Sequence, residues 1–326
     1  MKIYPDIDEI KRLSKDYNLI PLFTEILADL ETPVSAFMKI DQKRYSFLLE
    51  SVEGGEKLGR YSFLGGDPSL IFKAKGKHYQ IIKDGKYLAE EGEVANPIEK
   101  LKEIFSAYKV YTPDTLPPFF GGAVGYFSYD SIRMIEDLPD TLPDELELDD
   151  LVFIFTDSII IFDHVKHKIK IVHNLFIQKE SNLENEYDKA VQNIKFILNL
   201  LSNPLKINKQ KKVESSPVLT SNLNEKSFCE MVNKAKEYIK AGDIFQAVLS
   251  RRFSADVSNI EKINFYRALR SVNPSPYMFY LHFGDIHVIG SSPEILSKYA
   301  FDRIEVRPIA GTRKRGKTPD EELKLE

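Results

Sequence analysis

The chain has 326 residues, of which 43% are apolar and 29% charged, and its formal net charge is −4. This composition is normal for a globular protein, and the negative balance disfavours nucleic acid as the main partner, because phosphate-binding surfaces are usually basic. The single cysteine, Cys229, excludes an intrachain disulfide and a cysteine-ligated metal cluster. Without an apolar run of about 18 residues or a signal peptide, we expect no membrane partner and a cytoplasmic location.

The first 180 residues are expected to form mainly strands. The Asp-Gly pair at 84–85 predicts a tight hairpin turn, because both residues tolerate positive φ. Residues 158–162 and 168–172 form a second predicted hairpin, whose second arm alternates lysine with isoleucine. The glycine-rich run 119–126 lacks the lysine and hydroxyl residue of a phosphate-binding loop, so we interpret it as a strand with close backbone packing.

A polar segment divides the chain. Asn96-Pro97 predicts the start of one helix, and a longer helix is expected at 183–201, before Asn203-Pro204. Residues 205–219 are polar and basic without periodicity, which is typical of a linker. We therefore predict three sections, residues 1–203, a linker or mobile loop at 204–220, and a second section at 221–326.

The second section begins with a predicted helix that is capped near Asn224 and stops at Gly242. A strand is expected at 245–253, and a pair of strands at 277–283 and 286–290. Because strand runs and helix runs do not alternate strictly, the sequence favours an α+β fold with antiparallel sheets over a doubly wound parallel sheet.

Five short motifs carry the most specific signal in the chain. They are LLES at 48–51, GDIFQAVLSRRF at 242–253, NPSPYMF at 273–279, SSPE at 291–294 and VRPIAGTR at 306–313. In this order they resemble the chorismate-utilising enzymes, and most closely the family of anthranilate synthase large subunits (component I), from about residue 20 to the last residue. The resemblance implies two large antiparallel β-sheets packed as a sandwich with helices outside.

The resemblance also implies an enzyme, a lyase that converts chorismate and ammonia to anthranilate and pyruvate. In this family the reaction is the first step of tryptophan biosynthesis, a glutamine amidotransferase subunit (component II) supplies the ammonia, and L-tryptophan is a feedback inhibitor. Two alternatives stay open. They are aminodeoxychorismate synthase component I and a non-enzymatic tryptophan-binding module.

Two positions favour anthranilate synthase over its relatives. Where water-adding members of the family carry a lysine, this chain has Gln246, and a glutamine cannot act as a base at neutral pH. Where aminodeoxychorismate synthases often carry a nucleophilic lysine, this chain has Ala310. Read without the resemblance, both are ordinary strand or turn residues.

Four residues are candidates for the chorismate pocket. Gly311 lacks a Cβ, so a ligand can approach its backbone closely, and Thr312 adds a hydroxyl. We expect both to contact a substrate carboxylate, and Gln246 and Glu294 to line the pocket. For Glu294, a structural role is an equally good interpretation.

The resemblance places a tryptophan site on two distant motifs. Glu50 is expected to take the α-ammonium and Ser51 to donate or accept a hydrogen bond. Pro276, Tyr277 and Met278 offer rigid, aromatic and adaptable apolar surface for the indole. Local chemistry alone would favour a core strand and a turn.

Magnesium is the implied cofactor. In the family, the catalytic histidine and two magnesium-binding glutamates follow the segment that corresponds to Glu326. We therefore expect a chain that is incomplete at its C-terminus and inactive alone, with no secure catalytic residue and no metal ligand of its own.

Overall fold

The structure, a computed structural model, describes residues 2–41, 44–51, 59–178, 182–205, 217–300, 302–308, 314 and 316–325. It divides into two compact units, one made of Met1–Lys206 with Tyr266–Glu326 and the other of Ile207–Phe265. This division differs from the predicted sections, because the last part of the chain pairs with the first. The expected linker lies largely at residues 206–216, outside the described residues.

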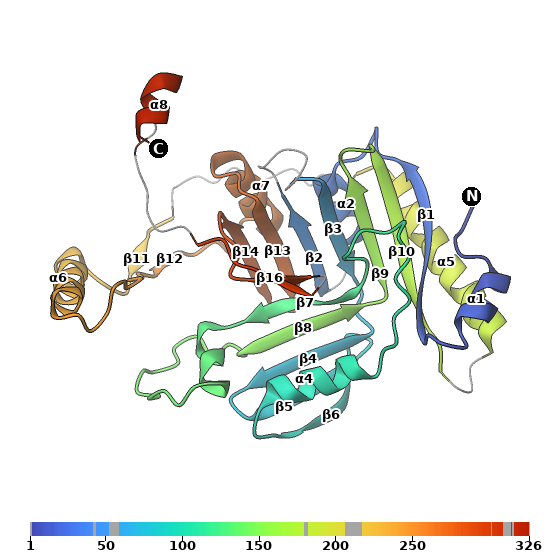
Figure 1. Ribbon diagram of the computed structural model, residues 1–326, viewed down its shortest axis with the longest axis horizontal. Helices are drawn as coiled ribbons and strands as arrows, with labels where there is room; N and C mark the ends of the chain where they lie inside the picture. Colours follow the sequence, from blue (N-terminus) through green and yellow to red (C-terminus); the bar gives the residue numbers. More distant parts are fainter. Residues whose placement is uncertain are drawn as a thin grey trace. The chain divides into compact units, whose positions relative to one another are not determined.

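A seven-stranded antiparallel sheet forms one layer of the larger unit (Figure 1). Its strands are β1 (Leu19–Leu27), β2 (Tyr45–Glu50), β3 (Tyr61–Gly66), β9 (Ser158–Asp163), β10 (Lys168–Phe176), β13 (Tyr277–Phe283) and β14 (Ile286–Ser292). Their order across the sheet is β1-β10-β9-β3-β2-β13-β14. The pairing of β2 with β13 therefore joins segments that are far apart in the sequence.

A five-stranded antiparallel sheet forms the second layer. Its strands are β4 (Leu70–Lys75), β5 (His78–Lys83), β6 (Tyr87–Glu93), β7 (Gly122–Phe127) and β8 (Leu151–Thr156), in the order β6-β5-β4-β8-β7. The β5–β6 turn holds Asp84 and Gly85 at φ 50° and 64°, as the hairpin prediction requires. The run 119–126 contributes β7, so the interpretation of these glycines as part of a strand is confirmed.

The main core lies between the two sheets. Phe47, Ile161 and Leu281 of the larger sheet form one buried cluster with Ile71 and Ile154 of the smaller sheet. Residues 159–163 of β9 are all buried, because one face of that strand meets the second sheet and the other meets helices. The expected α+β sandwich of two antiparallel sheets is thereby confirmed.

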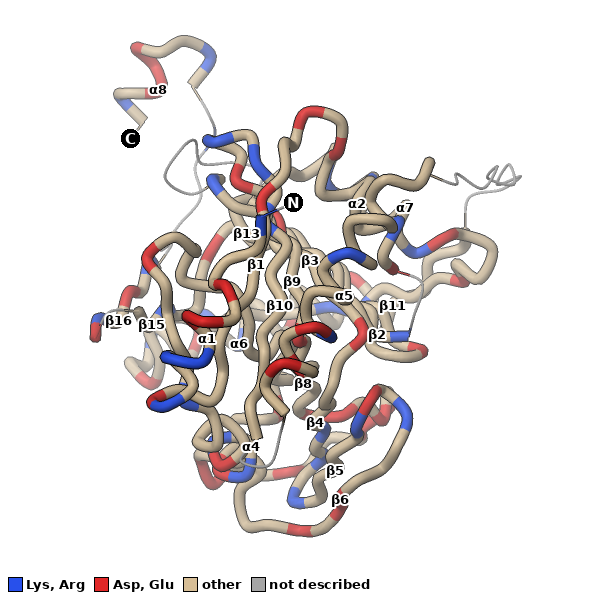
Figure 2. Tube along the Cα trace, turned by 90° about the vertical axis from the view of Figure 1, so that its right-hand side faces the viewer, with Lys and Arg blue, Asp and Glu red and all other residues tan. Residues whose placement is uncertain are grey.

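Helices cover the outer faces of both sheets (Figure 1). They are α1 (Ile7–Leu13), α2 (Pro33–Ile40) and α5 (Leu183–Ser202) beside the larger sheet, and α4 (Pro97–Ser106) on the smaller one. Each begins at a polar cap. Asn96 accepts a hydrogen bond from the Ile98 amide, and Asn182 accepts from Glu184. Charged residues lie on the turns, on the helices and on outer strands such as β6, whereas β3 and β9 are mostly uncharged (Figure 2).

The remaining elements of the larger unit are short. They are η1 (Tyr129–Met134), β15 (Lys298–Ala300), β16 (Arg303–Glu305) and α8 (Pro319–Leu325). A further helix, α7 (Lys262–Val272), crosses the boundary between the units, and its residues from Tyr266 onward belong to the larger one. No described helix is long and apolar enough to cross a lipid bilayer.

The smaller unit contains α6 (Glu225–Ala241) and the two-residue strands β11 (Thr220–Ser221) and β12 (Phe253–Ser254). Asn224 caps α6, and Gly242 ends it at φ 84°, so both predicted helix signals are confirmed. The strand expected at 245–253 is wrong, since only its last residue lies in a strand. An apolar run becomes a strand only where a neighbouring strand provides hydrogen-bond partners for its backbone N–H and C=O groups.

The close backbone packing at β7 leads to a prediction about the free energy of unfolding. A Cβ added at Gly125 would lie 1.9 Å from the Val152 carbonyl oxygen, a backbone atom that cannot turn aside. We expect Gly125→Ala to lower the free energy of unfolding by about 2–3 kcal/mol. The control is Gly92→Ala, whose Cβ would first meet the Tyr79 ring at 3.4 Å. Urea denaturation of both variants tests this, and equal effects would contradict it.

Candidate functional site

The two motifs assigned to tryptophan meet in the larger sheet. Glu50 is the last residue of β2 and Met278 the second of β13, and the two are direct partners in the antiparallel register. Cross-strand partners place their side chains on the same face of a sheet. The structure therefore brings one residue from each predicted half side by side.

Glu50 is a buried carboxylate with partners on α7. Its side chain is 5% exposed, and its Oε2 accepts hydrogen bonds from the Tyr266 hydroxyl at 2.6 Å and from Arg270 Nε at 3.1 Å. Burial and the neighbouring carboxylate raise the pKa of Tyr266 far above its ordinary value. The phenol therefore stays protonated, and its O–H donates a hydrogen bond to Glu50. The charge of Glu50 is thus compensated inside the protein.

The predicted tryptophan residues differ in their burial and in the face of the sheet on which they lie. Met278 is 1% exposed, Ser51 directly follows β2, and Pro276 precedes β13 and is partly buried. Tyr277 belongs to the opposite face of the sheet from Met278, because successive strand residues alternate. The structure therefore groups Glu50 and Met278, whereas Tyr277 faces the other way.

Of the residues predicted for the chorismate pocket, two lie in the described part of the chain, one in each unit. Gln246 is exposed in the smaller unit, within an irregular segment. Glu294 is exposed in the larger unit, where its backbone oxygen accepts a hydrogen bond from Ser292 Oγ at 2.8 Å. Gly311, Thr312 and Ala310 lie outside the described residues. The chorismate assignment of these residues stays a prediction.

Magnesium finds no donor set in the described part of the chain. No three His, Cys, Asp or Glu side chains of these residues are grouped as a metal ion would need. We therefore assign no described residue to magnesium.

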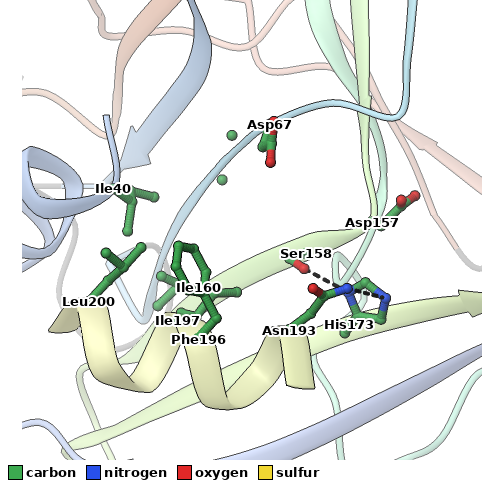
Figure 3. Close-up of a pocket in the computed structure, with 12 residues that line it drawn as sticks. Ile40, Asp67, Asp157, Ser158, Ile160, His173, Asn193, Phe196, Ile197 and Leu200 are labelled. Atoms are coloured by element: carbon green, nitrogen blue, oxygen red, sulfur yellow. Dashed lines mark hydrogen bonds between the residues drawn. The ribbon is translucent and has the colours of Figure 1, made fainter. Parts of the chain in front are cut away.

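Sequence reasoning missed a pocket of about 210 Å³ between the larger sheet and α5 (Figure 3). Ile40, Leu200, Ile197, Ile160 and Phe196 form its apolar side. On its polar side Ser158 and Asn193 point toward the His173 ring, with Ser158 Oγ 2.7 Å from Nδ1 and Asn193 Nδ2 3.5 Å from Nε2. The only sequence signal was a His-Asn pair inside an apolar strand.

The hydrogen bonds of His173 show what this cluster can do. An amide nitrogen only donates, so Asn193 requires Nε2 of the ring to accept, and Nδ1 then carries the proton and donates to Ser158. Burial lowers the pKa of His173 to about 4, so the ring is neutral at physiological pH. A histidine that donates to the serine cannot also remove its proton. The cluster therefore positions side chains and does not activate a nucleophile.

Comparison with known proteins shows the family to which the chain belongs. Residues 50–326 match the family described as chorismate binding enzyme. The chain is 45% identical to anthranilate synthase component 1 of Acetivibrio thermocellus and 41% identical to that of Aquifex aeolicus, over 99% and 100% of its length. It spans 66% of each of these relatives.

A solved structure is similar in fold and sequence. The crystal structure of anthranilate synthase component I from Streptococcus pneumoniae superimposes with a TM-score of 0.60 at 27% identity, covering 83% of this chain and 58% of that one.

The ion pair of Glu50 makes a prediction about stability. Replacing Arg270 with glutamine should leave a buried carboxylate with Tyr266 as its one close donor among the described residues, and lower the free energy of unfolding by about 1–3 kcal/mol. The matched control is Arg44→Gln, whose pair with Asp285 is exposed on both sides, so the change should stay below about 1 kcal/mol. Similar losses in both variants, measured by urea denaturation, would count against a buried charge at Glu50.

A second prediction concerns how the stability of the fold depends on pH. Because the pKa of His173 in the folded chain lies near 4, the unfolded chain binds a proton between about pH 4 and 6.5 that the folded chain excludes. The free energy of unfolding should therefore decrease as the pH is lowered from about 6.5 to 4. The variant His173→Gln should remove on the order of 2–3 kcal/mol of that decrease. Denaturation at pH 7 and pH 4.5 measures it. The control is His78→Gln at an exposed position, and an unchanged slope in His173→Gln would refute the idea.

Proposed function

Because the chain belongs to the family of chorismate-binding enzymes, we propose that it is part of component 1 of an anthranilate synthase. The whole protein would convert chorismate to anthranilate, with ammonia from a glutamine amidotransferase subunit and with magnesium as cofactor. Relatives at 45% and 41% identity that carry this name support the proposal. The same role places the protein in the cytoplasm.

One contact carries the regulatory part of the proposal, the cross-strand pairing of Glu50 with Met278. It unites the two motifs that the resemblance assigns to tryptophan, next to a donor-rich helix. We place the α-ammonium of tryptophan at Oε1 of Glu50, whose only close protein donor among the described residues is Arg270 at 3.4 Å. An ionised carboxylate offers about four acceptor sites, so this oxygen can accept a further hydrogen bond.

The amide of Gln246 supports the choice of ammonia over water. It has no basic group at neutral pH, so it cannot take a proton from an attacking water. In the whole enzyme the Gln246 amide would form hydrogen bonds, and the nucleophile would arrive already uncharged as ammonia.

Tryptophan binding tests the proposal directly. The chain contains no Trp, so the indole emission in a titration comes from the ligand alone. We expect L-tryptophan to bind the wild-type chain and Ser51→Phe to abolish binding by filling the site. Met278→Thr should weaken it by about 1–3 kcal/mol, since apolar contact is lost at a fully buried position.

The control is Met231→Thr, at a partly exposed position on α6 in the other unit. Circular dichroism must show that each variant is folded. A folded wild-type chain that gives no heat with tryptophan in calorimetry would overturn the regulatory assignment. So would a loss in Met231→Thr that equals the loss in Met278→Thr.

A further inference from the structure

A second pocket lies at the end of the sandwich where the chain passes from β8 to β9. Its volume is about 350 Å³, which falls within the usual range of about 300–1,000 Å³ for small-molecule sites. Its aromatic wall consists of Phe105, Tyr108, Phe120 and Phe155. Phe105 and Phe155 touch each other, with 5.1 Å between their centroids, and Phe105 is 43% exposed at the mouth. A ligand can therefore enter along an aromatic surface whose rings are already packed.

One carboxyl group faces this pocket. Asp157 connects β8 to β9 and lines the pocket, and its Oδ1 accepts a hydrogen bond from Ser69 Oγ at 2.8 Å. Because Ser69 lines the same pocket, this bond holds the carboxyl on the pocket's side of the chain. In Figure 3 the carboxyl points away from Ser158 and His173 of the first pocket. Asp157 therefore presents its charge to the aromatic pocket.

The second oxygen of this carboxyl can be reached from the pocket. Asp157 Oδ2 forms no hydrogen bond or ion pair with the described residues. Among those residues, Asn174 Oδ1 is the one side-chain oxygen or nitrogen that is both without a partner and closed to solvent. Asp157 Oδ2 is therefore open, and a molecule in the pocket can donate a hydrogen bond to it, whereas Asn174 Oδ1 takes no part.

The charge of Asp157 is not balanced by a cation in the described part of the chain. No described lysine or arginine forms an ion pair with it, and the exposed carboxylates of Asp84 and Asp67 lie near enough to repel it. Burial and this repulsion raise the pKa of Asp157 above its usual range, although the hydrogen bond from Ser69 acts in the opposite direction. A positive charge in the pocket would offset the cost of burial and the repulsion alike.

The wall around Phe120 is held in place by Asn174 of β10. Asn174 is 4% exposed, and its Nδ2 donates to the Phe120 carbonyl oxygen at 3.0 Å. A Cβ built at Gly121 would lie 2.3 Å from this Nδ2, so the bond forms only because residue 121 is glycine. The Asn18 amide donates to the Ala107 oxygen at 2.8 Å, which ties the end of α4 to β1. The pocket is therefore largely preformed.

We propose that this pocket binds a small organic cation, an ammonium group on an apolar body of about one ring, with its N–H groups directed at Asp157 Oδ2 and its apolar body against Tyr108 and Phe120. The ammonium supplies the counter-charge that Asp157 lacks, and hydrogen bonds between opposite charges are stronger than neutral ones. Aromatic faces attract a cation and favour burial of the apolar body. The site is separate from Glu50 and Met278, so it neither requires nor excludes the tryptophan proposal.

Benzylamine and benzyl alcohol test the need for a charge. The two have nearly the same shape, but at neutral pH the first carries an ammonium where the second has an uncharged hydroxyl. We expect the full chain to bind benzylamine about fivefold to tenfold more tightly than benzyl alcohol, measured by NMR titration at fixed ionic strength. Benzylamine should also shift the backbone amide signals of Gly121 and Gly122, which line this pocket, and not those of Gly65 and Gly66 beside His173.

Two charge variants locate the carboxylate that binds the ammonium. Asp157→Asn keeps the shape of the side chain and an acceptor for Ser69, but it removes the charge, so the affinities for the two probes should become equal. The control is Asp84→Asn, which removes a nearby carboxylate that does not line the pocket. Asparagine tolerates the positive φ of residue 84, and this variant should change the affinity for benzylamine by less than about twofold.

A second pair of variants tests the aromatic wall. Phe105→Ala should weaken the binding of both probes, whereas Phe196→Ala, at an exposed phenylalanine in the pocket beside His173, should change neither affinity. Equal affinities of the two probes for the wild-type chain, or no binding of benzylamine at roughly 10 mM, would overturn the proposal. So would equal losses in Asp157→Asn and Asp84→Asn, or in Phe105→Ala and Phe196→Ala.

Discussion

The antiparallel pairing of β2 with β13 is the interaction on which the larger unit depends. It places Tyr45 opposite Phe283 and Glu50 opposite Met278, and so adds β13 and β14 to a sheet whose other strands lie between residues 19 and 176. Closing so long a loop costs entropy, but that cost rises only slowly with loop length. A continuous ladder and the burial of Phe47 and Leu281 between the sheets offset it. One register shift would turn Glu50 toward the apolar core.

The buried charge of Glu50 follows from the same pairing. A carboxylate in this position is stable only with donors around it, and Tyr266 and Arg270 supply them from α7. Tyr266 also packs its ring edge-on against Tyr280 of β13, at 6.1 Å between centroids. Helix and sheet are therefore joined by one polar and one aromatic contact. These two contacts fix the position of α7 beside the residues that we assign to tryptophan.

Polar side chains recur where the chain passes from one sheet to the other. Asp157, at the β8–β9 crossing, lines both the pocket beside His173 and the pocket beside Asn174. At a crossing the strands diverge, so their side chains cannot close the space as they do in the middle of a sheet. His173 and Ser158 share a hydrogen bond there, whereas the side-chain oxygen of Asn174 is buried without a partner among the described residues.

The sequence by itself determined the local features of this protein. The caps at Asn96 and Asn224, the turn at Asp84 and Gly85 and the stop at Gly242 act within a few residues, so they could be predicted and were found. The ordered motifs also indicated the family and its antiparallel sandwich. Register, by contrast, depends on the free energy of the whole sheet. No local pattern could select Tyr266 and Arg270 as the partners of Glu50.

The tertiary structure also decided where local signals failed. The run at 245–253 has the apolar content of a strand, but strands need neighbours, and only Phe253 of that run lies in one. His173 and Asn174 appeared as two polar residues in an apolar strand. Their burial, the neutral imidazole and the unsatisfied amide oxygen arise from packing against Ser158, Asn193 and the segment around Gly121, none of which is a local sequence neighbour. Desolvation is a property of the packed surroundings, and the sequence does not state which segments will form them.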